Sequence, residues 1–132
     1  MRFGIDLLEV ARFARIAAHP RGRRLVFTAG ELARADALGE ARRLEYLAGR
    51  FCAKEAVAKT LGRGLGQGLV WHDIEVLADP HGAPVVTVRG GAREVAERAR
   101  IDRIELSLTH QAGMVICLAV AVPRSRDPES AA

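Results

Sequence analysis

Apolar residues recur along the chain with two periods, and each period predicts one type of secondary structure. Alternation over residues 2–8 favours a first strand, and apolar residues at helical spacing over 9–19 predict a helix that ends at Pro20 and Gly22. Thr28 and Glu31 have the spacing of a capping box, so a second helix is expected from Thr28 to near Gly39. Good helix formers and spaced apolar positions then predict one long helix over about 40–61.

Beyond a glycine-rich segment the period changes toward that of strands. Strands are expected over 69–77 and 83–88, a short amphipathic helix over 91–100, and a final hairpin whose strands cover 103–110 and 114–122. This order predicts an α+β fold in which a mainly antiparallel sheet packs against helices, one of them long. We expect one domain over 1–122 and a mobile C-terminal tail over 123–132.

Composition agrees with a single globular domain, since 49% of the 132 residues are hydrophobic and only 5% are aromatic. The core is therefore aliphatic, and association of subunits would help to stabilise it. The longest apolar stretch, 112–122, is shorter than the roughly 20 residues of a membrane-spanning helix. Asp6 and Glu9 interrupt the segment that a secretory signal would need to be apolar, so we expect a cytoplasmic protein without a membrane partner.

The two cysteines, Cys52 and Cys117, lie in apolar runs without the spacing of a metal or redox motif. Small buried hydrophobic side chains are therefore the favoured interpretation, and neither a disulfide nor redox chemistry is expected.

Positive charge is concentrated at the start of the chain. Residues 1–24 contain six arginines and two acidic residues, an excess of four charges that equals the net charge of the whole chain. This segment could face an acidic partner. A nucleic-acid-binding module is an alternative of another class, but basic runs interleaved with aromatic residues and zinc-ligand spacings are both missing from the sequence. No nucleic acid is therefore expected as a partner.

Several polar residues stand out from this background. Only two of the 20 basic residues are lysines, and Lys54 and Lys59 bracket Glu55. Glu55 and Lys59 could simply form an i,i+4 pair on a solvated helix face. Because Glu55 also shares a helix face with apolar neighbours, a partly buried carboxylate in need of a cation is the functional alternative. Asp6 lies within an apolar strand and must likewise have a partner or reach water.

His110 and the glycines are open to two interpretations each. His110 ends a row of core-facing strand positions, where a structural histidine is the commoner outcome. The segment from Gly62 to Gly68 lacks the features of a P-loop, and its glycines serve either to end a helix or to approach a phosphate closely.

Four segments in order carry a resemblance to a known family: GID near the N-terminus, FTAGEL, AGRFCAKEAVAKTLGRG and SLTH. They resemble holo-(acyl-carrier-protein) synthase, the small trimeric type of 4′-phosphopantetheinyl transferase, from about Phe3 to Val122. The most specific piece is R-F-x-A-K-E-A-x-x-K, which runs from Arg50 to Lys59. The chain departs from the family pattern at Arg2 and Arg63, where the family has a glycine and often a threonine.

The resemblance implies transfer of 4′-phosphopantetheine from coenzyme A to a serine of apo acyl carrier protein, for fatty-acid or polyketide synthesis. It implies that Asp6 and Glu55 bind Mg²⁺ and that Lys59 contacts the pyrophosphate, which makes these three the catalytic residues. The base that deprotonates the serine stays open between Glu55, a water on the metal and a water held elsewhere. A domain that binds the carrier protein without catalysis is a further alternative.

The same resemblance assigns binding residues. Coenzyme A would contact Lys59, Gly62, Gly64, His110, Arg42 and Arg50. The family site lies between protomers of a homotrimer, so Arg42, Arg50 and His110 are expected to act from a neighbouring chain. The acidic carrier protein would meet the N-terminal arginines, of which we assign Arg12, Arg15, Arg21 and Arg24.

Overall fold

A computed structural model describes residues 1–126 of the chain. Its helices are α1 (Val10–Ala17), α2 (Pro20–Val26), α3 (Ala29–Asp36), α4 (Glu40–Thr60) and α5 (Gly90–Arg98), and a short 3₁₀ turn, η1, covers Trp71–Asp73. Its strands are β1 (Arg2–Glu9), β2 (Ile74–Ala78), β3 (Pro84–Val88), β4 (Ile101–Gln111) and β5 (Met114–Pro123). The α+β class and the long helix are confirmed. In the part described, no helix has the length and apolar character needed to cross a membrane.

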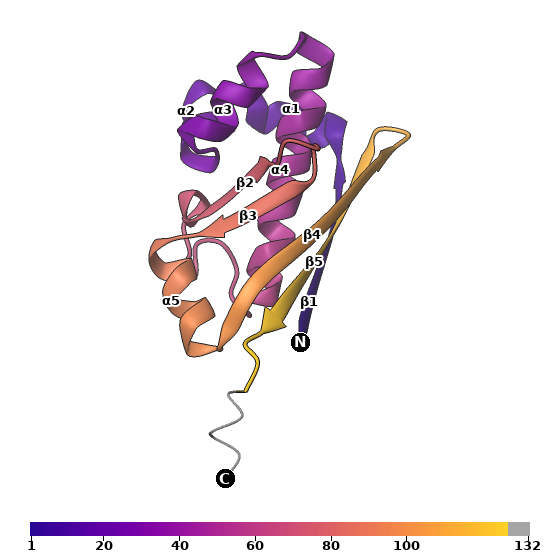
Figure 1. Cartoon of the computed structure of the whole chain (residues 1–132). Coiled ribbons are helices and arrows are strands. Elements are labelled where there is room, and N and C mark those ends of the chain that lie inside the picture. Colours follow the sequence, from indigo (N-terminus) through magenta and orange to yellow (C-terminus); the bar gives the residue numbers. More distant parts are fainter. Residues whose placement is uncertain (127–132) are drawn as a thin grey trace.

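Helix α4 is the centre of the fold (Figure 1). Strands β1, β5 and β4 form an antiparallel sheet in that order along one side of α4, and the antiparallel pair β2–β3 packs on another side. Helices α1, α2 and α3 gather near the N-terminal half of α4. The α4 residues that contact the sheet are small: Cys52 touches the backbone of β1 and β5, Gly49 touches Cys117 of β5, and Ala56 lies against Gly4 of β1. Small side chains let the strands lie close to the helix.

Local sequence signals placed two features correctly. Thr28 and Glu31 form the predicted capping box at the start of α3, where each side chain accepts a hydrogen bond from the other residue's backbone. The final hairpin turns within the expected segment 111–113: Gln111 still pairs with Met114, and Ala112 and Gly113, with φ angles of 51° and 75°, form a two-residue type I′ turn.

Three boundaries differ from the sequence predictions. Pro20 and Gly22 were expected to end the first helix, but Pro20 begins α2 and Gly22 lies inside it. Proline is favoured at the first position of a helix, which explains the start of α2 at Pro20. Helix α3 ends at Asp36, before Gly39. The strand expected over 69–77 begins only at Ile74, because η1 precedes it. The predicted tail lies largely outside the described residues and stays a prediction.

The outer face of the three-stranded sheet is apolar and exposed. Phe3, Ile5 and Leu7 of β1 are 64%, 60% and 59% exposed. The register places Ile5 beside Leu118 and Leu7 beside Ile116 of β5, and those two side chains are also exposed. A continuous apolar patch of this kind on a folded domain typically marks a contact surface.

Candidate active site

A cleft of about 450 Å³ lies where the end of β1, helix α1 and the middle of α4 meet. Its wall contains both predicted catalytic carboxylates, Asp6 and Glu55, together with aromatic and basic side chains. The lining residues are Asp6, Leu7, Leu8, Glu9, Arg12, Phe13, Ile16, Phe51, Glu55 and Met114. A larger cavity of about 670 Å³ between α1 and the N-terminal half of α4 is lined mainly by alanine and leucine and contains none of the predicted catalytic residues. The chemistry therefore favours the smaller cleft.

Asp6 reaches this cleft because β1 runs directly along α4. Its side chain accepts a hydrogen bond from Lys59 Nζ at 3.3 Å, and the same ammonium donates to the backbone oxygen of Ile5 at 2.7 Å. The partner that a carboxylate in an apolar strand requires is therefore Lys59. The ammonium of Lys59 is thus held at the edge of the cleft by β1.

Glu55 projects from the middle of α4 and is half-buried beside Phe51. Burial raises the pKa of Glu55, the neighbouring carboxylate of Asp6 raises it further, and the ammonium of Lys59 opposes both effects. A carboxylate whose pKa is raised by a second carboxylate beside it forms with that neighbour a site that a cation would stabilise. The alternative in which Glu55 only decorates a solvated helix face does not describe this position.

The donor set fits Mg²⁺. Among residues 1–126 there is no cluster of three or more histidine, cysteine or acidic side chains that could bind a metal by themselves. Mg²⁺ commonly binds through one or two protein carboxylates and takes its other ligands from substrate phosphates and water. Asp6 and Glu55 supply that number of carboxylates in one open cleft.

The predicted nucleotide-binding residues do not all meet at this cleft within one chain. Arg42 is exposed in the first turn of α4, thirteen residues before Glu55, so the two lie about 20 Å apart along the helix axis. The ring of His110 packs over Gly49, where an added Cβ would lie 3.5 Å from its Nε2. One chain alone therefore leaves the arginine and the carboxylate apart.

Arg50 makes contacts within the chain that stabilise the fold. It is buried, its Nε and Nη2 donate to the backbone oxygens of Val76 and Leu77 at 3.1 and 3.5 Å, and its guanidinium lies 4.2 Å from the centre of the Tyr46 ring. Arg50 thus ties α4 to β2. Its contact with coenzyme A stays a prediction.

Gly62 ends α4 with a φ of +72°, and the N–H groups of Gly62 and Arg63 bond to backbone oxygens of the last turn. This is the role of a glycine that stops a helix. The N–H of Gly64 bonds to the side chain of Gln67 at 3.2 Å. Contact of either glycine with a cofactor also stays a prediction.

The four arginines assigned to the carrier protein are all exposed on α1 and α2 or at their ends. Arg12 lines the cleft itself, and Arg15 lies with it beside Glu9 in a neighbouring hollow. Arg21 and Arg24 line a separate hollow with Leu25. The basic surface therefore begins at the cleft and continues away from it.

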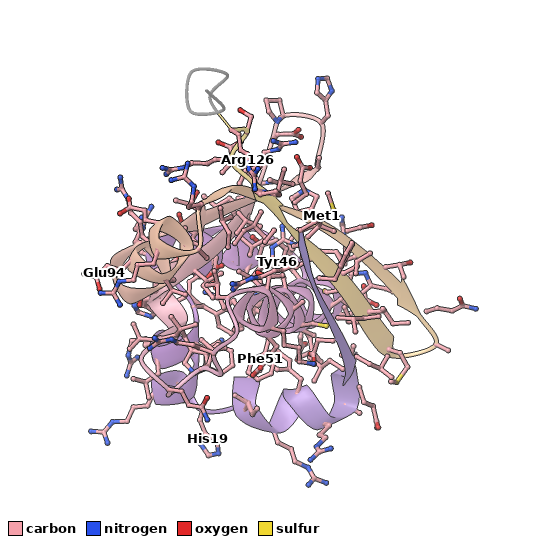
Figure 2. The ribbon with its side chains drawn as sticks, turned by 90° about the horizontal axis from the view of Figure 1, so that it is seen from below. Met1, His19, Tyr46, Phe51, Glu94 and Arg126 are labelled. Carbon is pink, nitrogen blue, oxygen red and sulfur yellow. The ribbon has the colours of Figure 1, made fainter. Side chains whose placement is uncertain are left out.

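Sequence reasoning missed the aromatic wall of the cleft. Phe51 lies 5.3 Å from Phe13 of α1 and stacks on Trp71 at 4.8 Å between ring centres. In Figure 2, where α4 is seen nearly end-on, Phe51 lies on the side toward α1 and Tyr46 on the opposite side. The helical spacing of Phe51 and Glu55 was the available signal for one of these rings, whereas the position of Trp71 depends on tertiary contacts.

Both cysteines are free and buried, as predicted. A hydrogen bond with Cys117 raises the pKa of the Cys52 thiol well above its usual range, and burial raises it further. The Cys52 thiol is therefore held in its protonated form, and neither cysteine lines the cleft.

Comparison with known proteins identifies the fold and its family. Residues 2–118 match the family model described as the 4′-phosphopantetheinyl transferase superfamily. A holo-[acyl-carrier-protein] synthase of Bacillus pumilus is 40% identical over 81% of this chain and 83% of that protein, and one of Beutenbergia cavernae is 44% identical over 89% and 94%. A structure of the holo-(acyl-carrier-protein) synthase of Bacillus anthracis in complex with CoA (3′,5′-ADP) has a TM-score of 0.79 at 28% identity, over 93% of this chain and 96% of that one. The chain belongs to the 4′-phosphopantetheinyl transferase superfamily.

Proposed function

We propose that this chain is a Mg²⁺-dependent holo-(acyl-carrier-protein) synthase, which transfers 4′-phosphopantetheine from coenzyme A to a serine of apo acyl carrier protein. Adenosine 3′,5′-bisphosphate is the other product. The transfer follows from the family and from relatives named for this activity. The observation that carries the metal dependence is the pair of carboxylates, Asp6 and Glu55, in one cleft beside Lys59.

The chemistry is a displacement at phosphorus. The serine oxygen forms a bond to the phosphorus that bears pantetheine, the bond from that phosphorus to the bridging oxygen breaks, and the serine proton passes to a base. Mg²⁺ held by Asp6 and Glu55 would neutralise charge on the phosphate oxygens. Lys59 supplies a second positive charge, which stabilises the charge that develops on the leaving phosphate.

The metal assignment favours water over Glu55 as the base. Burial and the Asp6 carboxylate raise the pKa of Glu55, which by itself would make Glu55 a stronger proton acceptor than an ordinary glutamate. A carboxylate that binds Mg²⁺ is a weaker proton acceptor, because the metal withdraws charge from its oxygens. We therefore favour water as the immediate acceptor of the serine proton.

We propose that the active form is a homotrimer with sites between protomers. Two observations support association with further copies of this chain: the apolar outer face of the β1–β5–β4 sheet, and the separation of Arg42 from Glu55 along α4. In such an assembly one protomer would bind the coenzyme A diphosphate near Lys59, Gly62 and Gly64. A neighbouring protomer would contribute Arg42, Arg50 and His110 to the same coenzyme A molecule.

The acidic acyl carrier protein is the proposed protein partner. Arg12 is exposed at the cleft, and Arg15, Arg21 and Arg24 extend the positive surface along α1 and α2. A partner steered by such a surface binds faster at low ionic strength, so the KM for the carrier protein should rise with salt. We place the reaction in the cytoplasm, because Asp6 and Glu9 interrupt the N-terminal segment that a secretory signal would need to be apolar.

The experiment that tests the metal assignment compares Asp6→Asn and Glu55→Gln with the unchanged chain. Both substitutions remove a negative ligand with almost no change in volume, so each should nearly abolish transfer while the assembly survives. Transfer at the unchanged rate in both variants would refute the assignment of Asp6 and Glu55 as metal ligands.

The same assay separates the two alternative functions. If the chain only binds the carrier protein, the unchanged chain should show no transfer. If the chain is a nucleic-acid-binding module, it should instead bind DNA or RNA with an affinity that falls steeply with salt.

A further inference from the structure

Lys54 is a buried cation that the proposed chemistry does not use. Its side chain and that of Glu31 are both 0% exposed, and Lys54 Nζ lies 2.8 Å from Glu31 Oε1. The ammonium also donates to the backbone oxygens of Trp71, at 3.1 Å, and of Ile74. An ammonium has three protons to donate, and all three have acceptors here. Lys54 therefore has one fixed geometry.

Glu31 is equally well satisfied from the other side. Its Oε1 accepts the N–H of Thr28 at 2.9 Å and its Oε2 accepts the N–H of Val76 at 2.8 Å. The pair thus joins four segments: the start of α3, the middle of α4, η1 and β2. A buried charge is costly unless it is paired and hydrogen-bonded, and both charges meet that condition.

These contacts lead directly to the cleft. Lys54 precedes Glu55 in α4, and the backbone that it holds at Trp71 carries an indole that stacks on Phe51 at 4.8 Å. Phe51 lies one turn before Glu55 and, with Phe13 at 5.3 Å, forms the wall of the cleft. The position of this wall relative to Glu55 therefore depends on where the ion pair holds η1.

We propose that the Lys54–Glu31 pair is a positioning device: it fixes η1 and, through the Trp71 indole that stacks on Phe51, the Phe51–Phe13 wall of the cleft against Glu55, so that the cleft has the geometry needed for transfer. Lys54 touches no reacting atom and is a positioning residue. The two charges and their directional hydrogen bonds connect α3, α4, η1 and β2 in one arrangement, and we infer that apolar side chains of equal volume would specify this arrangement less strictly. This inference rests on the proposed function, since it assigns the pair a role in that reaction.

The test separates positioning from stability. Lys54→Met alone leaves Glu31 buried without its cation, so this variant should lose thermal stability. The double variant Lys54→Met/Glu31→Leu removes both charges but also the acceptor of the Thr28 and Val76 N–H groups, so its melting temperature should lie above that of Lys54→Met and below that of the unchanged chain. We expect its kcat to stay about 10- to 100-fold low, as small displacements of catalytic groups produce. The KM for the carrier protein, which is set by arginines on α1 and α2, should change little.

A second readout does not depend on activity. Trp71 is the only tryptophan of the chain, so its emission and its quenching by acrylamide report the position of the wall. In the double variant the emission should shift to longer wavelength and the quenching should increase, and calorimetry should show weaker binding of Mn²⁺, used as the probe of the carboxylate pair. The matched control is Arg93→Met/Glu97→Leu, which removes an exposed i,i+4 pair on α5 and should change none of these readouts.

Each outcome decides the question. A double variant with the stability, Trp71 emission and kcat of the unchanged chain would overturn the proposal. If the double variant does not fold, Trp71→Leu keeps the ion pair and removes the ring, and it should lower kcat about tenfold. Unchanged turnover by Trp71→Leu would equally overturn the proposal. If the unchanged chain shows no transfer, the proposed function fails, while Trp71 emission and Mn²⁺ affinity still test the positioning role.

Discussion

Gly4 of β1 lies directly against the backbone of Ala56 in α4, so closely that a Cβ atom at Gly4 would clash with the Ala56 carbonyl oxygen and would lie 3.0 Å from Cβ of Lys59. Only glycine permits this approach. Two residues later in the same strand, on the same side, Asp6 meets the ammonium of Lys59. The contact between Gly4 and Ala56 therefore sets the distance between the strand that carries one carboxylate and the helix that carries the other.

Gly4→Ala should consequently damage both stability and activity. Because the added methyl group meets backbone, the strand must move, and we expect a loss of about 1–3 kcal/mol in the free energy of unfolding. The rate of transfer should also fall, because Asp6 moves with the strand and no longer lies at its proper distance from Glu55. Urea unfolding and a transfer assay measure the two effects.

Gly39→Ala is the matched control, because nothing lies within 4 Å of the position that a Cβ atom at Gly39 would take. Its expected cost in the free energy of unfolding is about 1 kcal/mol or less, because alanine is a poorer helix cap than glycine. Equal effects of both variants would contradict this role of Gly4.

Local patterns predicted most of the fold because they act over a few residues. The capping box at Thr28 and the hairpin turn at Ala112 and Gly113 are determined by neighbours in sequence, and the structure confirms both. Helix α2 was missed because Pro20 is compatible with both the end of one helix and the beginning of another.

The partners of buried charges could not be predicted in the same way. The sequence indicated that Asp6 needs a partner, but Lys59 is 53 positions away. Glu31 was predicted only as part of a capping box, and its second role beside Lys54 depends on how α3 packs against α4. Distant contacts of this kind have no local period or spacing.

Lys59 is expected to affect the rate far more than stability. Its side chain is 53% exposed, so the salt bridge with Asp6 contributes only about 0–1 kcal/mol to folding. Lys59→Met removes a charge that stabilises the leaving phosphate, and kcat should fall about 10²- to 10³-fold. Steady-state kinetics beside thermal unfolding tests this. A kcat within twofold of that of the unchanged chain would exclude Lys59 from the reaction.

The raised pKa of Glu55 predicts how stability varies with pH. Burial and the Asp6 carboxylate favour the protonated form of Glu55 in the folded chain. The contribution of Glu55 to stability is thus complete below the pKa of the unfolded chain, about 4.3, and is lost as pH rises through the higher folded-state pKa. With a chelator present, Glu55→Gln should therefore be more stable than the unchanged chain at pH 7.

Unfolding in urea across pH 3–8 measures this difference, which should shrink toward zero at the acidic end. Mg²⁺ should reverse it at pH 7, because a ligand that binds the folded state stabilises only the chain that retains both carboxylates. A Glu55→Gln variant that is less stable than the unchanged chain in the chelator at pH 7 would show that Asp6 and burial do not destabilise the Glu55 carboxylate.

The apolar sheet face predicts the effect of a charge placed on it. Leu118→Glu should dissociate the assembly and abolish transfer, whereas Val85→Glu on β3, which is 46% exposed, should do neither. Light scattering after size-exclusion chromatography measures the mass of the assembly that each variant forms. If protomers share sites, an inactive Arg42→Ala chain and an inactive Glu55→Gln chain should regain part of the activity when they are mixed and allowed to exchange. A fully active Leu118→Glu monomer would contradict the shared site.

We propose that Asp6 and Glu55 support metal-dependent transfer from coenzyme A. Intact mass spectrometry of an apo acyl carrier protein, incubated with this chain, coenzyme A and Mg²⁺, tests both the transfer and its dependence on the metal. The carrier should gain the mass of one phosphopantetheinyl group, and EDTA should prevent the gain. Unchanged carrier mass across several carrier proteins would contradict the transfer, and a gain that persists in EDTA would contradict the metal site.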